Sequence, residues 1–246
     1  MQKLLIALFL YQFPAFSQGD LPFTKGESLE YKIHYGPIDA GKATLKVQQE
    51  EGNYCFFAEG KSTGVFNLFF KVRDSYESII DANSLCPIYF NRNVREGNYK
   101  KKENVFFNQL SHQAESTRDT IPLPDNYQDL LSVFYYLRSH HLDKFQPGDT
   151  IAIQVYLDDE FMSSNLSYVG RDTLKTKFGR ISSTLWAPQL ELGRVFDEKY
   201  GMKIWVSDDE NKIPLRVETK ILVGSIKMDL TAYRGLKKPL KLTNSK

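Results

Sequence analysis

The chain has 246 residues, of which 41% are hydrophobic and 25% are charged, as in an ordinary globular protein. Its net charge of +2 lacks the strong basic excess of most nucleic-acid-binding proteins, so we expect no nucleic-acid partner. Phenylalanine and tyrosine are abundant, at 17 and 14 residues. Because aromatic side chains suit the pleated surface of a sheet, this composition favours strands.

The first residues have the pattern of a cleavable signal peptide. A short positive region precedes the apolar stretch Leu4–Leu10, and Ala15 and Ser17 are the small residues that a signal peptidase requires. This stretch is too short to span a bilayer, which takes about 20 apolar residues, and no later segment is long enough. We predict a signal peptide over residues 1–18, cleaved near Ser17 or Gln18, and a periplasmic or secreted mature protein without a transmembrane segment.

Alternation of apolar and polar residues recurs through most of the chain, as in strands with one buried face. It predicts strands over 29–35, 43–47, 54–60, 69–81, 88–95, 99–107, 151–157, 162–169, 174–178, 181–186, 202–206, 213–220 and 221–233. Short turns separate many of them, as in an antiparallel meander. We therefore expect a mainly β fold, an antiparallel meander curved into a barrel or half-barrel. Pro214 lacks a backbone donor, so its strand should begin there or lie at an edge.

One segment has helical periodicity instead. Asp125 and Gln128 have the spacing of a capping box, and apolar residues recur at helical intervals from Tyr127 to Leu137. We predict a helix over about 126–139, packed against the sheet because its wide apolar face must be buried.

No linker, repeat or composition shift divides the chain. We expect a single β-rich domain over residues 19–235, followed by a disordered basic tail over residues 236–246.

The sequence has no recognisable catalytic or metal-binding motif. Its four histidines and two cysteines lack the spacing of a zinc site, and no Gly-x-Ser-x-Gly elbow occurs. The acidic turns at 158–160 and 207–211 lack the spacing of a calcium-binding EF-hand. We expect no catalytic residue, no metal and no cofactor. A catalytic carboxylate pair among the 30 acidic residues stays open.

Two charged residues are predicted to face the interior of the sheet. Asp74 shares a strand face with Tyr76, and Arg92 shares one with Phe90. Pairing the two apolar faces places Asp74 opposite Arg92. Because a buried charge needs a partner, we predict an ion pair between them, either structural or the polar anchor of a ligand cavity.

The same register separates the two cysteines. It places Cys86 near Ile80 and Cys55 near Arg73, two strands apart and offset along the strands. This separation exceeds the reach of a disulfide, so the register disfavours the disulfide that export would permit.

A sheet of many strands can curve around a cavity, which aromatic residues of its inner face would line. The alternative is that these aromatic side chains fill the core, as they usually do. On the first interpretation, the predicted ligand-binding residues are Tyr31, Tyr35, Phe56, Asp74, Tyr76, Phe90 and Arg92.

Several short motifs occur in a fixed order along the mature chain. They include Gly26-Glu27-Ser28-Leu29 with Tyr31, the segment 72–78, the helical segment 131–138, Ile204-Trp205-Val206-Ser207-Asp208-Asp209 and Val223-Gly224-Ser225-Ile226. Together they resemble an exported bacterial family known as domain of unknown function 3108. The resemblance implies an exported protein of Gram-negative bacteria with a β-barrel-like or strongly curved sheet, and it assigns no activity and no site residue.

Three functional classes remain after these observations, and we rank them in this order. The first is an exported, non-catalytic protein that binds a lipid or another apolar ligand. The second is a protein-interaction module of an envelope complex, which would expose an apolar patch. The third is an envelope glycan or lipid hydrolase with a carboxylate pair.

Overall fold

The computed structural model describes residues 21–141, 144–190, 201–221 and 224–243, and the predicted signal peptide lies outside them. The elements of the first half are β1 (Ser28–Tyr35), β2 (Ile38–Glu50), β3 (Asn53–Ser62), α1 (Phe66–Phe69), β4 (Arg73–Ile80), β5 (Pro87–Glu96), β6 (Tyr99–Asn108), β7 (Gln113–Ser116) and β8 (Thr120–Pro122). Those of the second half are β9 (Tyr127–Asp129), α2 (Ser132–Ser139), β10 (Thr150–Leu157), β11 (Glu160–Thr176), β12 (Gly179–Leu190), β13 (Met202–Ser207), β14 (Pro214–Lys220) and β15 (Ser225–Arg234).

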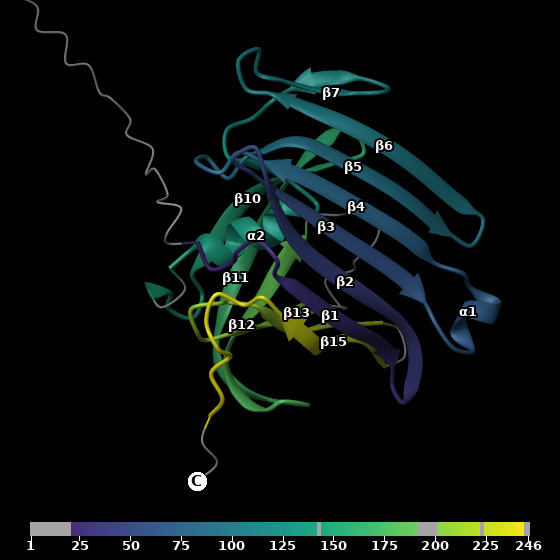
Figure 1. Ribbon diagram of the computed structural model, residues 1–246, viewed down its shortest axis with the longest axis vertical. Helices are drawn as coiled ribbons and strands as arrows, with labels where there is room; N and C mark the ends of the chain where they lie inside the picture. Colours follow the sequence, from purple (N-terminus) through teal and green to yellow (C-terminus); the bar gives the residue numbers. More distant parts are fainter. Residues whose placement is uncertain (1–20, 142–143, 191–200, 222–223, 244–246) are drawn as a thin grey trace, which may run out of the picture.

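All these strands belong to one 15-stranded sheet. Its order runs from β8 to β1 and then from β15 to β9, so the first and last strands of the chain pair in the middle. The sheet curves around α2 without closing, and β8 and β9 are its outer strands (Figure 1). The predicted fold class is confirmed: the chain is mainly β, with a curved meander and a helix packed against it.

The helix α2 joins the two halves of the sheet. Tyr135 stacks on Phe56 of β3, with ring centroids 3.6 Å apart, and both side chains are fully buried. Val133 packs instead with Ile151 of β10 and Trp186 of β12. Because an α-helix turns through about 100° per residue, positions two apart face different directions and reach both walls. Among the described residues, no helix is long and apolar enough to span a bilayer.

The predicted start of this helix is wrong. Tyr127–Asp129 forms β9, which pairs in parallel with β10, and the helix begins six residues later than expected, at Ser132. The Oδ1 atom of Asp129, rather than the predicted cap Asp125, accepts hydrogen bonds from the backbone N–H groups of Leu131 and Ser132. Strand pairing has therefore overridden a local capping pattern.

The segment that we predict to be disordered, after residue 235, is described as far as residue 243. Leu240 is buried in the cluster that contains Leu29 and Tyr31. The backbone N–H of Lys238 donates to Oδ1 of Asn211 at 3.0 Å. Residues 236–243 thus lie against the sheet rather than apart from it.

Asp129 gives the fold a pH dependence. It is completely buried, and burial raises its pKa to about 6 despite hydrogen bonds from Ser78, Leu131 and Ser132. Between about pH 4 and pH 6 the folded protein therefore holds a proton that the unfolded chain has released. Because the folded-state pKa is the higher one, this residue's contribution to stability falls as the pH rises through that window.

Asp129→Asn should remove this loss, because an asparagine keeps the Oδ1 acceptor and carries no charge. Relative to this variant, we expect the wild-type protein to lose about 2–3 kcal/mol of unfolding free energy between pH 4 and pH 7. Urea unfolding of both proteins at the two pH values measures the difference. If the two proteins differ in unfolding free energy by the same amount at both pH values, the prediction is contradicted.

Candidate functional site

The concave face of the second half carries a continuous apolar row. Strand register aligns Trp186 with Ile204, Ile204 with Val217, and Val217 with Met228, across β12 to β15. The sequence neighbours of these residues point to the opposite face, because side chains alternate along a strand. Those of Val217 and Met228 are charged, whereas those of Trp186 are apolar. The row forms one wall of a groove, and α2 forms the facing wall.

This groove has a volume of about 610 Å³. Its lining residues are Leu130, Val133, Phe134, Leu137, Arg138, Ile151, Ile153, Val155, Leu157, Met162, Ser163, Ser164, Leu166, Trp186, Pro188, Met202, Ile204, Val206, Pro214, Val217 and Met228. Only two serines and one arginine among them carry polar side chains. Small-molecule sites are concave, mostly apolar and about 300–1,000 Å³ in volume, and the groove has these properties.

Arg138, the one charged residue of this lining, is fully engaged elsewhere. Its Nη1 and Nη2 atoms donate to the two carboxylate oxygens of Glu27, at 2.6 and 2.9 Å. It also donates to the carbonyl oxygens of Pro22 and Asn211. Burial lowers the pKa of the guanidinium, but Glu27 outweighs it and raises the pKa, so the charge persists and is neutralised within the protein. Among the residues that the structure describes, the lining therefore offers no unpaired charge to a ligand.

Methionine is concentrated in the groove. Three of the four methionines of the sequence, Met162, Met202 and Met228, line it, and the fourth is Met1. Methionine side chains are flexible and polarisable, and they adapt to irregular apolar partners. The sequence-based prediction missed all the groove residues, and the methionines were the signal that could have pointed to them.

The seven predicted ligand-binding residues lie outside the groove. Three of them are core residues: Phe56, Phe90 and Tyr31 are at most 1% exposed. The hydroxyl of Tyr31 donates to the carbonyl of Pro214 at 3.0 Å. Tyr76 packs between two core clusters, whereas Tyr35 is 37% exposed. The ligand-binding role of these residues stays a prediction.

The predicted ion pair between Asp74 and Arg92 does not form, because each residue has other partners. Arg92 lies opposite Tyr76, two residues away from the expected register, and it pairs with Glu103 at 2.6 Å and with Asp158. Asp74 accepts a hydrogen bond from the backbone N–H of Arg95 instead. Arg92 does face the interior, at 6% exposure, but its partners come from β6 and from the β10–β11 turn.

The observed pairing of β3 with β4 also shows that the predicted surroundings of Cys55 are wrong. Cys55 lies opposite Ile79 rather than near Arg73, whereas Cys86 lies beside Asp81 at the turn after β4. Both cysteines are free. Burial raises the pKa of both thiols, so neither is activated as a nucleophile.

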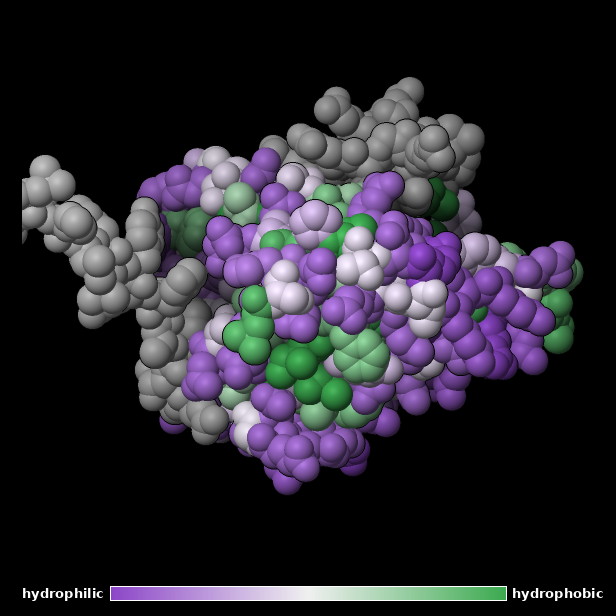
Figure 2. Space-filling model, turned by 90° about the horizontal axis from the view of Figure 1, so that it is seen from above, coloured by the Kyte–Doolittle hydropathy of each residue, from purple (hydrophilic) through white to green (hydrophobic). Residues whose placement is uncertain are grey.

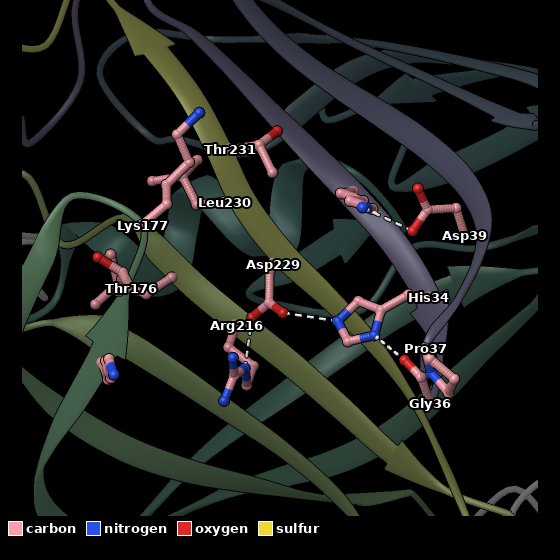
Figure 3. A pocket seen from close by; sticks show the side chains of 13 residues that line it. His34, Gly36, Pro37, Asp39, Thr176, Lys177, Arg216, Asp229, Leu230 and Thr231 are labelled. Carbon is pink, nitrogen blue, oxygen red and sulfur yellow. Dashed lines mark hydrogen bonds and ion pairs between the residues drawn. The ribbon is translucent and has the colours of Figure 1, made fainter.

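A second cavity, of about 390 Å³, lies at the tip of the β11–β12 hairpin (Figure 3). Its other walls come from β1, the β1–β2 turn, β14 and β15. Arg216 and Asp229 line it, whereas their neighbours Val217 and Met228 line the groove. Because successive strand residues point to opposite faces, the two cavities lie on opposite faces of β14 and β15.

Most of the charged side chains in this second cavity pair with one another, and Lys175 and Lys177 line it as well. Asp229 accepts hydrogen bonds from Nε of Arg216 at 2.5 Å and from Nε2 of His34 at 2.8 Å, as Figure 3 shows. Burial tends to raise the pKa of Asp229, but these two bonds outweigh it and lower the pKa. Lys32 pairs with Asp39 at 2.6 Å. We therefore regard the apolar groove as the stronger candidate site.

No group of three or more His, Cys, Asp or Glu side chains that could hold a metal ion occurs among the residues that the structure describes. The comparison with protein families then identifies the chain. Residues 30–231 match the family described as Protein of unknown function (DUF3108). The chain belongs to this family. No curated protein matches the sequence.

This DUF3108 chain can also be compared with solved structures. It resembles a β-barrel-like protein of the DUF1849 family from Brucella abortus, with a TM-score of 0.59 at 9% identity over 87% of this chain and 99% of that one. This likeness supports the fold. A structure with a YmcC-like fold from Bacteroides fragilis, named as a candidate exported protein, gives a TM-score of 0.38 at 12% identity over 89% and 99% of the two chains. The hypothetical protein CT021 from Chlamydia trachomatis gives 0.42 at 9% identity over 90% and 93%.

Proposed function

We propose that this DUF3108 chain is an exported binding protein that holds an apolar ligand in the groove between α2 and β10–β15. The observation that carries the proposal is the groove itself, a cavity of about 610 Å³ with an almost wholly apolar lining. Burying an apolar chain there would remove hydrocarbon from water on both sides of the contact, which is worth about 25 cal/mol per Å².

The lining also restricts the chemistry of the ligand. A charge placed inside the groove would lose its hydration without gaining a partner, because Glu27 already neutralises Arg138. The part of the ligand within the groove should therefore be uncharged hydrocarbon, such as an acyl chain. A polar head group, where the ligand has one, should stay at the opening in water.

Val217→Trp should block the groove. Val217 lies in the middle of the apolar row and is partly exposed, so a larger side chain extends into the free space. Binding of the neutral dye N-phenylnaphthylamine, followed by its fluorescence, should be about tenfold weaker in this variant or lost, a change of about 1.4 kcal/mol or more.

Val169→Trp is the matched control. Val169 is 45% exposed on β11, outside the groove lining, and this variant should bind the dye as the wild-type protein does. Circular dichroism checks that both variants are folded. Equal dye affinity in all three folded proteins would contradict the proposed site.

A further inference from the structure

The connection between β3 and β4 exposes a cluster of large apolar side chains. The single turn α1 buries none of its residues, and Leu68 and Phe69 are 80% and 83% exposed. Val65, Phe66 and Phe70 are exposed as well. Single apolar residues are normal on a protein surface, but a contiguous apolar group of this kind marks an interaction site. We call residues 61–71 the apolar tip.

Contacts at its base hold the apolar tip in place. The Oγ atom of Ser62 donates to Oδ1 of Asn67 at 2.8 Å, and it accepts a hydrogen bond from the backbone N–H of Val72 at 2.9 Å. The backbone N–H of Gly97, in the β5–β6 turn, donates to the carbonyl of Lys71 at 2.9 Å. The tip is thus anchored to the neighbouring hairpin, whereas Val65, Leu68 and Phe69 point into solvent.

The two charged residues within the apolar tip are both cations. Lys61 and Lys71 bound it, and Arg73 lies opposite Lys61 at the start of β4. The exposed Lys100 begins the basic run of β6, one strand beyond β5. Glu96 lies opposite Val72, at the base of the connection rather than in the tip. This charge is complementary to an anionic surface.

The shape of the apolar tip favours a lipid surface over a protein groove. Figure 1 shows α1 projecting beyond the end of the sheet, and Figure 2 shows hydrophobic atoms at the same end of the molecule, surrounded by hydrophilic ones. A projecting tip needs a partner that can deform around it. Aromatic side chains favour the interfacial layer of a bilayer, and flanking lysines add attraction to anionic head groups.

We propose that the apolar tip inserts into the interfacial layer of a bilayer that contains anionic lipid. Phe66, Leu68 and Phe69 enter the layer, and Lys61 and Lys71 contact the head groups. The inference goes beyond the proposed ligand groove and does not depend on it, because no tip residue lines the groove.

Flotation with vesicles tests this proposal. The probes are vesicles of phosphatidylglycerol and phosphatidylethanolamine in equal parts, and vesicles of phosphatidylcholine alone. Wild-type protein should float with the anionic vesicles, and less with the neutral ones. The double substitution Leu68→Asp, Phe69→Asp should weaken binding at least tenfold, because two exposed apolar anchors are replaced by carboxylates.

The control is Leu110→Asp, in the turn after β6, where the leucine is 96% exposed outside the tip. It should float as the wild-type protein does, and so should the groove variant Val217→Trp. Leu68→Trp should show a blue shift of tryptophan emission on adding anionic vesicles, and Leu110→Trp should not. The proposal is overturned if wild-type protein does not float, or if the double variant floats equally well. It is also overturned if light scattering shows that the wild-type protein is a dimer and that the double substitution abolishes only this dimer. A second copy of the chain would then be the partner.

Discussion

Glu27→Ala is expected to destabilise the protein by about 3–5 kcal/mol, because it leaves a buried guanidinium without its counter-ion. Glu27 and Arg138 are 1% and 4% exposed, and they form a bidentate ion pair. Arg138 also donates to the carbonyl of Asn211, in the turn between β13 and β14. The pair therefore ties the segment before β1 and the turn before β14 to the end of α2, and its loss should weaken packing in both halves.

Glu30→Ala is the matched control, since Glu30 is an exposed glutamate of β1. Its effect should stay within about 0.5 kcal/mol. The double substitution Glu27→Leu, Arg138→Met should recover part of the loss, because an apolar pair leaves no unpaired charge. Equilibrium urea unfolding measures all three variants. A Glu27→Ala loss below about 1 kcal/mol would show that water or another group compensates the guanidinium.

Phe56→Ala should cost a similar amount, about 3–5 kcal/mol, by leaving a cavity in the core. Phe56 is fully buried, stacks on Tyr135 and meets the edge of Phe23 with ring centroids 5.4 Å apart. Truncating it would remove this stacking contact between β3 and α2. Because α2 forms one wall of the groove, binding of N-phenylnaphthylamine should weaken only through this loss of structure.

Phe106→Ala is the control, because Phe106 is a phenylalanine of β6 that is 58% exposed. It should change the unfolding free energy by about 0.5 kcal/mol or less. The sequence-based expectation makes Phe56 a ligand contact, and the two roles give different results. A contact residue would lose affinity for the dye at unchanged stability, and that result would contradict the core role.

Much of the fold could be predicted because the alternation of apolar and polar residues shows which face of a half-buried strand is buried. Pro214 begins β14 as expected, and the strands at 88–95 and 99–107 are each found within one residue of the predicted bounds. The register of β4 and β5 could not be predicted, because a shift of two residues keeps every side chain on its face. The structure has a bulge between Ile79 and Ile80, which apolar alternation does not reveal.

The groove could not be predicted for a related reason. Periodicity identifies the apolar faces of α2 and of the later strands, but it does not reveal whether two apolar faces touch or leave space between them. Tyr135 packs tightly on Phe56, whereas Leu137 borders the open groove, although both belong to α2. The difference arises from the distance between α2 and each half of the sheet, which is a property of the whole fold.

Native mass spectrometry of protein purified without detergent from the host's exported fraction tests the apolar-ligand account most directly. We expect wild-type protein to carry a stoichiometric lipid-like mass that solvent extraction removes, Val169→Trp to carry the same mass, and Val217→Trp to lack it. A folded wild-type protein that shows only its own mass, even after incubation with an envelope lipid extract, would contradict the account.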